Sequence, residues 1–97
     1  MELKFEWDEK KNVININKHG ISFEEAAVVF SDQKRYEIYD KIHSFFEKRW
    51  KTVGLSGIKL LRVTFTERND KIRIISARKA DKNDTKEYFY GYGTTNN

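Results

Sequence analysis

The side chains best suited to chemistry in this 97-residue chain lie close together in sequence, at His43, Glu47 and Arg49. Histidine ordinarily changes its charge between pH 5 and 8, a carboxyl group can exchange a proton, and arginine matches the geometry of a phosphate. Groups of these kinds can cleave RNA without a metal ion. A base takes the proton of the 2′-OH, the oxygen attacks the adjacent phosphorus, an acid protonates the leaving oxygen, and cations stabilise the phosphoryl charge. The spacing therefore indicates a candidate RNA-cleaving site, with an ordinary solvated loop histidine as the alternative for His43.

A second concentration of charge lies in the stretch IRIISARKA, residues 72–80, which carries Arg73, Arg78 and Lys79. A core strand rarely carries so many charges. Alternation along a strand places Arg73 on the face away from the flanking isoleucines, with Ala77 on its own side. Arg78 has the parity of the isoleucines but stands at the strand end, where it can leave the core or follow a bulge. The stretch therefore indicates a charged sheet surface.

Positive charge is concentrated in the second half of the chain. Residues 1–48 contain eight Lys or Arg and ten Asp or Glu, whereas residues 49–97 contain eleven and five, with five of the six arginines. Because arginine binds phosphate through two parallel hydrogen bonds, this distribution favours a nucleic-acid or acidic-protein partner. Small soluble proteins are often this basic, however, and some arginines can pair with Glu6, Glu67 or Asp70 across the sheet. We expect at least one arginine to be structural.

Other classes of site have little support in the sequence. The chain has no cysteine, which excludes a disulfide framework, a thiolate zinc site and a thiol nucleophile. The two histidines are far apart, and no metal-ligand spacing or glycine-rich phosphate loop is present, so we expect no metal and no cofactor. No apolar run approaches the roughly 18 residues of a membrane span, and the N-terminus does not resemble a signal peptide. These features predict a soluble, cytoplasmic protein with no membrane partner.

The candidate residues must be positioned by surrounding helices and strands, beginning with two helices near the N-terminus. Asp8 and Gly20 delimit the first, whose Val13, Ile14 and Ile16 supply only part of an apolar face, which predicts a peripheral helix. In the second, Ser22 and Glu25 have the spacing of a capping box, and the helix runs to about Phe30.

Strands and a final helix account for the rest of the chain. We predict strands at residues 3–7, 35–40, 48–56, 59–67 and 71–78, and a helix capped by Asp81 over about 80–90. The last three strands are separated by turn residues and form a meander of hairpins. The order β-α-α-β-β-β-β-α predicts an α+β domain with helices packed on an antiparallel sheet of about five strands. We expect one domain over residues 1–90 and a flexible tail over 91–97.

Several of these segments together resemble the BrnT toxins of type II toxin–antitoxin systems. The resemblance rests on FEWDEKKNVININKHGISFEEAAVVF (5–30), Glu47-x-Arg49-Trp50, Gly54, TER (66–68) and IRIISARKA (72–80). It implies a RelE-like ribonuclease fold and a small endoribonuclease that cuts RNA, inhibits translation and arrests growth. It also implies a BrnA-type ribbon-helix-helix antitoxin as partner, with DNA contacted only through the toxin–antitoxin complex. The chain departs from the family at Gln33, where a proline is common, and at Asp84, where glutamate is usual.

The resemblance also implies a set of functional residues, all of them basic or able to exchange a proton. We expect Arg68 and Arg78 to bind phosphate and stabilise the transition state, with Glu47 or His43 as acid or base. Arg73 is the arginine most suited to a structural role. The catalytic candidates are His43, Glu47, Arg49, Arg68 and Arg78, and the RNA-binding candidates are Lys4, Arg62, Arg73 and Lys79.

Two alternatives to a ribonuclease toxin remain open at this point. The basic sheet could belong to a non-catalytic module that binds RNA or an acidic antitoxin segment and acts in complex formation and operon autoregulation. The chain could also be an inactive toxin kept for complex formation. Cleavage of RNA would distinguish a ribonuclease toxin from both alternatives. Binding of RNA that stays intact, with a strong salt dependence, would favour the binding module.

Overall fold

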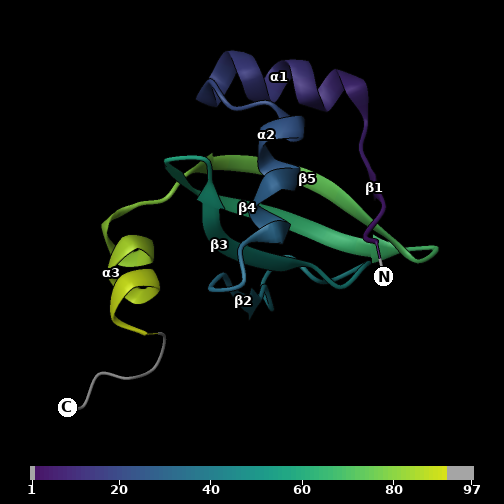
Figure 1. Cartoon of the computed structure of the whole chain (residues 1–97). Helices are drawn as coiled ribbons and strands as arrows, with labels where there is room; N and C mark the ends of the chain where they lie inside the picture. Colours follow the sequence, from purple (N-terminus) through teal and green to yellow (C-terminus); the bar gives the residue numbers. More distant parts are fainter. Residues whose placement is uncertain (1, 92–97) are drawn as a thin grey trace.

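A five-stranded sheet forms the centre of the computed structural model, which describes residues 2–91 (Figure 1). The strands lie in the order β1-β5-β4-β3-β2. The elements in chain order are β1 (Phe5–Glu6), α1 (Glu9–His19), α2 (Phe23–Val28), a 3₁₀ turn η1 (Val29–Ser31), β2 (Tyr36–Tyr39), β3 (Trp50–Ser56), β4 (Lys59–Arg68), β5 (Lys71–Lys79) and α3 (Lys82–Tyr90). The predicted α+β class and element order are confirmed, and the predicted tail lies outside the described residues except for Gly91.

The sheet is mixed rather than purely antiparallel. Strands β2 to β5 pair antiparallel, with two-residue turns between β3 and β4 and between β4 and β5, but β1 runs parallel to β5, with Phe5 opposite Ile72. The prediction of an antiparallel sheet is therefore correct for four strands and wrong for β1. The reason is topological, because two helices separate β1 from the other strands and no hairpin fixes its direction.

Helices α1 and α2 lie on one side of the sheet, and α3 lies beyond the sheet end opposite the β4–β5 hairpin (Figure 1). The core is formed between α2 with η1 and the covered face of the sheet. Phe30 is its centre, since its ring lies 5.0 Å from that of Phe65 and 5.3 Å from that of Phe5. Phe23 and Ala26 of α2 are fully buried against the same face. No helix of residues 2–91 is long and apolar enough to span a membrane.

The helix boundaries follow the predicted capping residues. Asp8 accepts a hydrogen bond from the backbone of Lys10 at the start of α1, and Gly20 ends that helix with φ of 71°. Ser22 and Glu25 form the predicted capping box of α2. Asp81 begins α3, and Asp84 completes a second capping box.

The partial apolar face of α1 is exposed to solvent, as a peripheral helix predicts, and two asparagines form the buried side of the helix instead. Val13, Ile14 and Ile16 are 50%, 61% and 41% exposed, whereas Asn12 and Asn15 are buried. The Asn15 amide donates to the carbonyl of Ala77 at 2.8 Å, and its oxygen accepts from the backbone N–H of Ala77 at 3.2 Å. Strand β1 pairs only with residues 72 and 73, so the edge of β5 at Ala77 has no strand beside it. Asn15 supplies the hydrogen bonds that such a strand would have made.

A bulge in β5 determines which arginines share a face. Opposite residues are Thr64 and Ser76 before the irregularity and Phe65 and Ile74 after it, so one extra residue lies in β5. Ala77 consequently returns to the core, where it is fully buried, and the prediction that it shares a side with Arg73 is wrong.

The sheet face away from α1 and α2, called the open face below, carries the charged side chains. Arg62 and Arg78 lie directly opposite each other on it, because residues paired across antiparallel strands point to the same side. Helix α3 covers one end of this face, where Val53 is 1% exposed. The Tyr36 hydroxyl donates to the carbonyl of Asp84 at 3.2 Å and contributes to that contact.

Asp32 orders the segment after η1, in which the next residue is Gln33 and not a proline. Its Oδ1 accepts from the backbone N–H of Lys34 at 2.9 Å, which closes a turn two residues long. Its Oδ2 accepts from the backbone N–H of Leu55 at 2.8 Å and so fixes the turn to β3. Gly54 beside it has no room for a side chain, since a Cβ there would lie 2.9 Å from the Cβ of Arg35 and from Cγ1 of Val29.

Candidate functional site

Glu47 joins two of the predicted arginines at one end of the sheet. Its Oε1 accepts from Nη2 of Arg68 at 3.0 Å, and its Oε2 accepts from Nη2 of Arg49 at 3.3 Å. Arg49 immediately precedes β3 and Arg68 ends β4, and these two strands are neighbours in the sheet. Sheet pairing therefore brings together Glu47, Arg49 and Arg68, called the Glu47 cluster below.

The Glu47 cluster has an excess of positive charge. Burial raises the pKa of Glu47, but the hydrogen bonds from Arg68 and Arg49 lower it more, so the net shift is downward. The carboxyl group is therefore ionised at neutral pH and does not carry a proton to donate. Two guanidinium groups face one carboxylate, which leaves the cluster able to accept a phosphate.

The loop between β2 and β3 is closed by local hydrogen bonds. The backbone N–H of Asp40 donates to the carbonyl of Arg49 at 2.9 Å and extends the strand pairing by one step. The Ser44 hydroxyl donates to the carbonyl of Asp40 at 2.5 Å and accepts from the backbone N–H of Arg49 at 2.9 Å. These contacts hold His43 and Glu47 in one short loop.

His43 is oriented by Asp40. Its Nδ1 lies 3.0 Å from Oδ2 and 3.1 Å from Oδ1 of the carboxylate, and its side chain is 61% exposed whereas that of Asp40 is 7% exposed. Burial raises the pKa of Asp40, but the hydrogen bonds from the side chain and backbone of His43 lower it more, so Asp40 is ionised at neutral pH. An ionised partner keeps the proton on Nδ1 and leaves Nε2 to exchange a proton with a ligand.

Sequence reasoning did not identify Asp40 as part of this site. The available signal was an aspartate three residues before a histidine in a segment predicted as a loop. The His43 ring is held by a carboxylate and is also solvated, so its role as a base stays a prediction.

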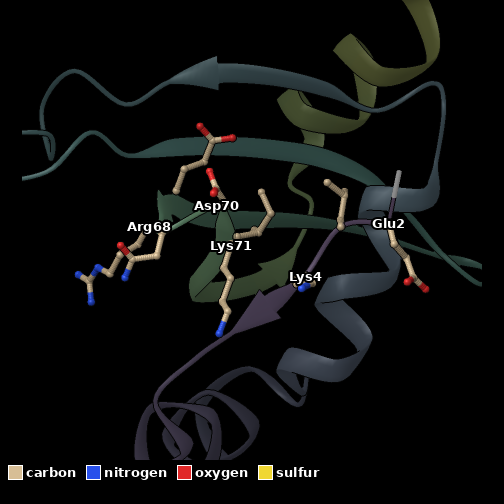
Figure 2. A pocket seen from close by; sticks show the side chains of 9 residues that line it. Glu2, Lys4, Arg68, Asp70 and Lys71 are labelled. Carbon is tan, nitrogen blue, oxygen red and sulfur yellow. The ribbon is translucent and has the colours of Figure 1, made fainter.

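A pocket beside the Glu47 cluster adds two lysines. Figure 2 shows Arg68 and Lys71 extending from the β4–β5 hairpin, with Lys4 contributed by the segment that leads into β1. The turn residues Asn69 and Asp70 have φ of 53° and 64°, as a two-residue hairpin turn requires. Arg68 also lines a second pocket with Glu47, so the two pockets meet at this residue. Lys4, predicted to bind RNA, thus lines a pocket that shares Arg68 with the Glu47 cluster, and Lys71, which lines the same pocket, was not among the predicted residues.

Arg78 lies at the other end of the sheet from Arg68. It stands opposite Arg62 on β4, and Arg62 is six residues from Arg68, about 20 Å of strand at a rise of roughly 3.3 Å per residue. Arg62 pairs with Asp84 at 3.3 Å and with Asp81 at 3.5 Å, which ties it to α3. The structure therefore does not bring Arg78, Arg62 or the neighbouring Lys79 to the Glu47 cluster.

Arg73 has a structural contact. Its Nη1 lies 3.4 Å from Oε2 of Glu6 on the neighbouring strand β1, in the pairing where these two residues are opposite each other. The expectation that at least one arginine forms an ion pair across the sheet is confirmed. Among residues 2–91, no group of three or more His, Asp or Glu side chains is arranged to hold a metal ion.

The structure is a small α+β domain that has arginines at one end of its sheet and a histidine held by a carboxylate. These features define a class of protein suited to phosphodiester chemistry. Residues 7–84 match the model of the family described as ribonuclease toxin, BrnT, of type II toxin–antitoxin system. The chain belongs to this family, and the predicted resemblance is confirmed. A type II system implies a protein antitoxin as partner. A comparison with curated proteins gives no match.

Proposed function

We propose that the chain is an endoribonuclease that cleaves RNA by metal-independent attack of the 2′-OH. The observation that carries this proposal is the position of one loop, which holds His43 against Asp40 and Glu47 against both Arg49 and Arg68. Family membership supports the general activity. For this particular reaction, the loop offers a candidate base, His43, and two candidate phosphate-binding cations, Arg49 and, through Glu47, Arg68 of β4.

The proposed reaction uses His43 as the base. Nε2 takes the proton of the 2′-OH, the 2′-oxygen forms a bond to phosphorus, and the bond from phosphorus to the 5′-oxygen breaks. The leaving oxygen takes a proton from solvent, so the products are a 2′,3′-cyclic phosphate and a 5′-hydroxyl. Arg68 and Arg49 stabilise the negative charge that develops on the phosphoryl oxygens. Glu47, which is ionised, orients the two arginines.

The cellular role proposed here follows from the family. Cleavage of cytoplasmic RNA inhibits translation and arrests growth, and a BrnA-type ribbon-helix-helix antitoxin neutralises the domain formed by residues 1–90. The complex then contacts operator DNA through the antitoxin. Arrest of growth on induced expression, relieved by co-expression of the adjacent antitoxin frame, is the expected result.

The biochemical test is cleavage of a defined RNA in the presence of EDTA. Cleavage should continue in EDTA, stop at a position that carries a single 2′-deoxy substitution, and leave a 2′,3′-cyclic phosphate. Arg68→Ala should lower the rate about 10²- to 10³-fold, the usual effect of removing one transition-state donor. Lys18→Ala is the matched control, because Lys18 lies on α1, across the sheet from the open face. Full activity of Arg68→Ala, or cleavage that EDTA abolishes, contradicts the proposal.

A non-catalytic RNA-binding module is the second candidate, and the open face favours it as a specific alternative. Arg62 and Arg78 lie opposite each other far from His43, so part of the cationic surface can contact RNA without taking part in chemistry. Bound RNA that stays intact, with affinity that falls steeply as salt rises, would support this candidate.

A further inference from the structure

Two aromatic side chains in the loop between β2 and β3 are almost fully exposed. Phe45 is 85% exposed and Phe46 is 94% exposed, and together they place two phenyl rings in solvent. Leaving large aromatic groups in water forgoes the stabilisation that burial would give. An exposed pair of this size is therefore a candidate contact surface.

The two rings are placed by an ordered loop. Their centroids lie 4.7 Å apart at an interplanar angle of 80°. Ser44, the residue before them, is fixed by hydrogen bonds to both sides of the loop, and Glu47, the residue after them, is fixed by Arg68 and Arg49. The phenyl rings therefore lie in the same loop as Glu47, on the two residues that precede it in the chain.

The surroundings of the rings favour a nucleic acid over an apolar protein surface. Their sequence neighbours in the loop are mainly charged or polar, including Lys41, His43 and Lys48. Arg49 lies three residues after Phe46, and both Arg49 and Arg68 contact Glu47, the residue that follows Phe46, so both can offer phosphate contacts near the loop. Aromatic faces next to cations form the usual arrangement for unpaired nucleotides, because bases stack on the rings while the phosphates contact the cations.

We propose that Phe45 and Phe46 form a base-stacking platform that binds one or two unpaired bases next to the phosphate held by the Glu47 cluster. This inference rests on the proposed function and extends it, because it makes single-stranded RNA the substrate. A base inside a duplex keeps its faces covered by its neighbours and cannot occupy such a platform.

The test measures binding of a short 2′-O-methyl oligoribonucleotide, which cannot be cleaved because its nucleophile is blocked. Phe45→Ala/Phe46→Ala should weaken binding about fivefold to hundredfold, the usual range for one stacked base. Phe45→Leu/Phe46→Leu, which keeps apolar side chains without rings, should lose most of the same affinity. Ile58→Ala is the matched control, because Ile58 is 98% exposed in the turn between β3 and β4 at the other end of the sheet.

A second arm identifies the stacked base. Oligonucleotides with one abasic position are compared in turn, and one position should weaken binding to the wild-type protein but not further weaken binding to the double alanine variant. The melting temperature of each variant is measured alongside, and it should not change because the rings are exposed.

The outcomes separate the platform from the proposed function. Equal binding by the wild type and the double alanine variant overturns the platform while the proposed function stands. Loss of antitoxin binding with RNA binding intact overturns it as well and assigns the rings to the protein partner. Absence of both RNA cleavage and RNA binding in the wild type overturns the proposed function and the platform with it.

Discussion

Nη2 of Arg68 donates to Oε1 of Glu47 at 3.0 Å across 21 residues of sequence. This contact ties the loop between β2 and β3 to the end of β4. It also determines the role of the carboxylate, because an ionised Glu47 that bridges two arginines positions cations and has no proton to give. His43, whose Nδ1 is held by Asp40, is then left as the proposed base of this loop.

The pH dependence of cleavage should distinguish these two side chains. The lowered pKa of Glu47 means that its carboxyl group loses its proton below the ordinary value of about 4.3, so its charge does not change between pH 5 and 8. The rate should depend on pH in this interval only through the proposed base, His43, and not through Glu47. His43→Gln should remove that dependence and lower the rate about 10²- to 10⁴-fold. Initial rates measured at constant ionic strength from pH 4.5 to 9 provide the check.

Two variants complete this comparison. Glu47→Gln should keep the pH dependence of the cleavage rate between pH 5 and 8. Asp40→Asn should lower the rate, because Nδ1 of His43 then loses its ionised partner. If the pH dependence of the rate disappeared in Glu47→Gln and persisted in His43→Gln, Glu47 and not His43 would be the base.

Arg68 and Arg78 should differ in what their loss affects. Arg68 contacts Glu47, which lies four residues after His43 in the same loop, whereas Arg78 lies opposite Arg62 at the other end of the sheet. Arg78→Ala should weaken RNA binding and reduce the slope of log affinity against log salt by about 1, with little effect on the rate at saturating RNA. Arg68→Ala should lower that saturated rate. Equal loss of saturated rate in both variants would contradict the separation of the two ends.

The local elements of the fold could be predicted from the sequence, because their signals lie within a few residues of one another. The capping box of Ser22 and Glu25 and the left-handed turn at Gly20 depend only on nearby backbone groups. The position of Arg78 could not be predicted in the same way. It depends on one extra residue in β5, and nothing in the alternation of that strand shows where the extra residue lies.

The candidate site was predicted in composition but not in arrangement. His43, Glu47 and Arg49 lie within seven positions of the sequence, and the loop keeps them together. The contact with Arg68 requires β3 and β4 to be neighbours, which is a property of the sheet. The burial of Asn15 has the same kind of cause, since it depends on how short β1 is.

Asn15→Ala should be strongly destabilising. The substitution removes hydrogen bonds to the carbonyls of Ile21 and Ala77 and leaves both backbone groups of Ala77 without their partner. A loss of about 2–4 kcal/mol in the free energy of unfolding is expected, with the melting temperature falling by roughly 4–8 °C for each kcal/mol. Thermal and urea unfolding measure the loss. Asn17→Ala is the control on the exposed side of α1, and its effect should stay within about 0.5 kcal/mol.

Tyr88 should report how α3 is attached to the rest of the chain. Its hydroxyl donates to Oδ2 of Asp32 at 2.5 Å, and burial together with this hydrogen bond raises the pKa of Tyr88 to about 12. The unfolded value is about 10, so the folded state favours the neutral hydroxyl. Its contribution to stability is therefore fully present below pH 10 and is lost as pH rises from 10 towards 12.

Titration of tyrosine absorbance near 295 nm tests this attachment directly. The wild-type protein should show a component that ionises near pH 12, and Tyr88→Phe should lack it. The difference in unfolding free energy between the two proteins should be constant at neutral pH and shrink above pH 10, because ionised tyrosine cannot donate to the carboxylate of Asp32. Tyr39→Phe, which alters a 42% exposed side chain on β2, should keep the component near pH 12. If Tyr88→Phe kept that component, Asp32 would not be the partner that holds α3 against the turn after η1.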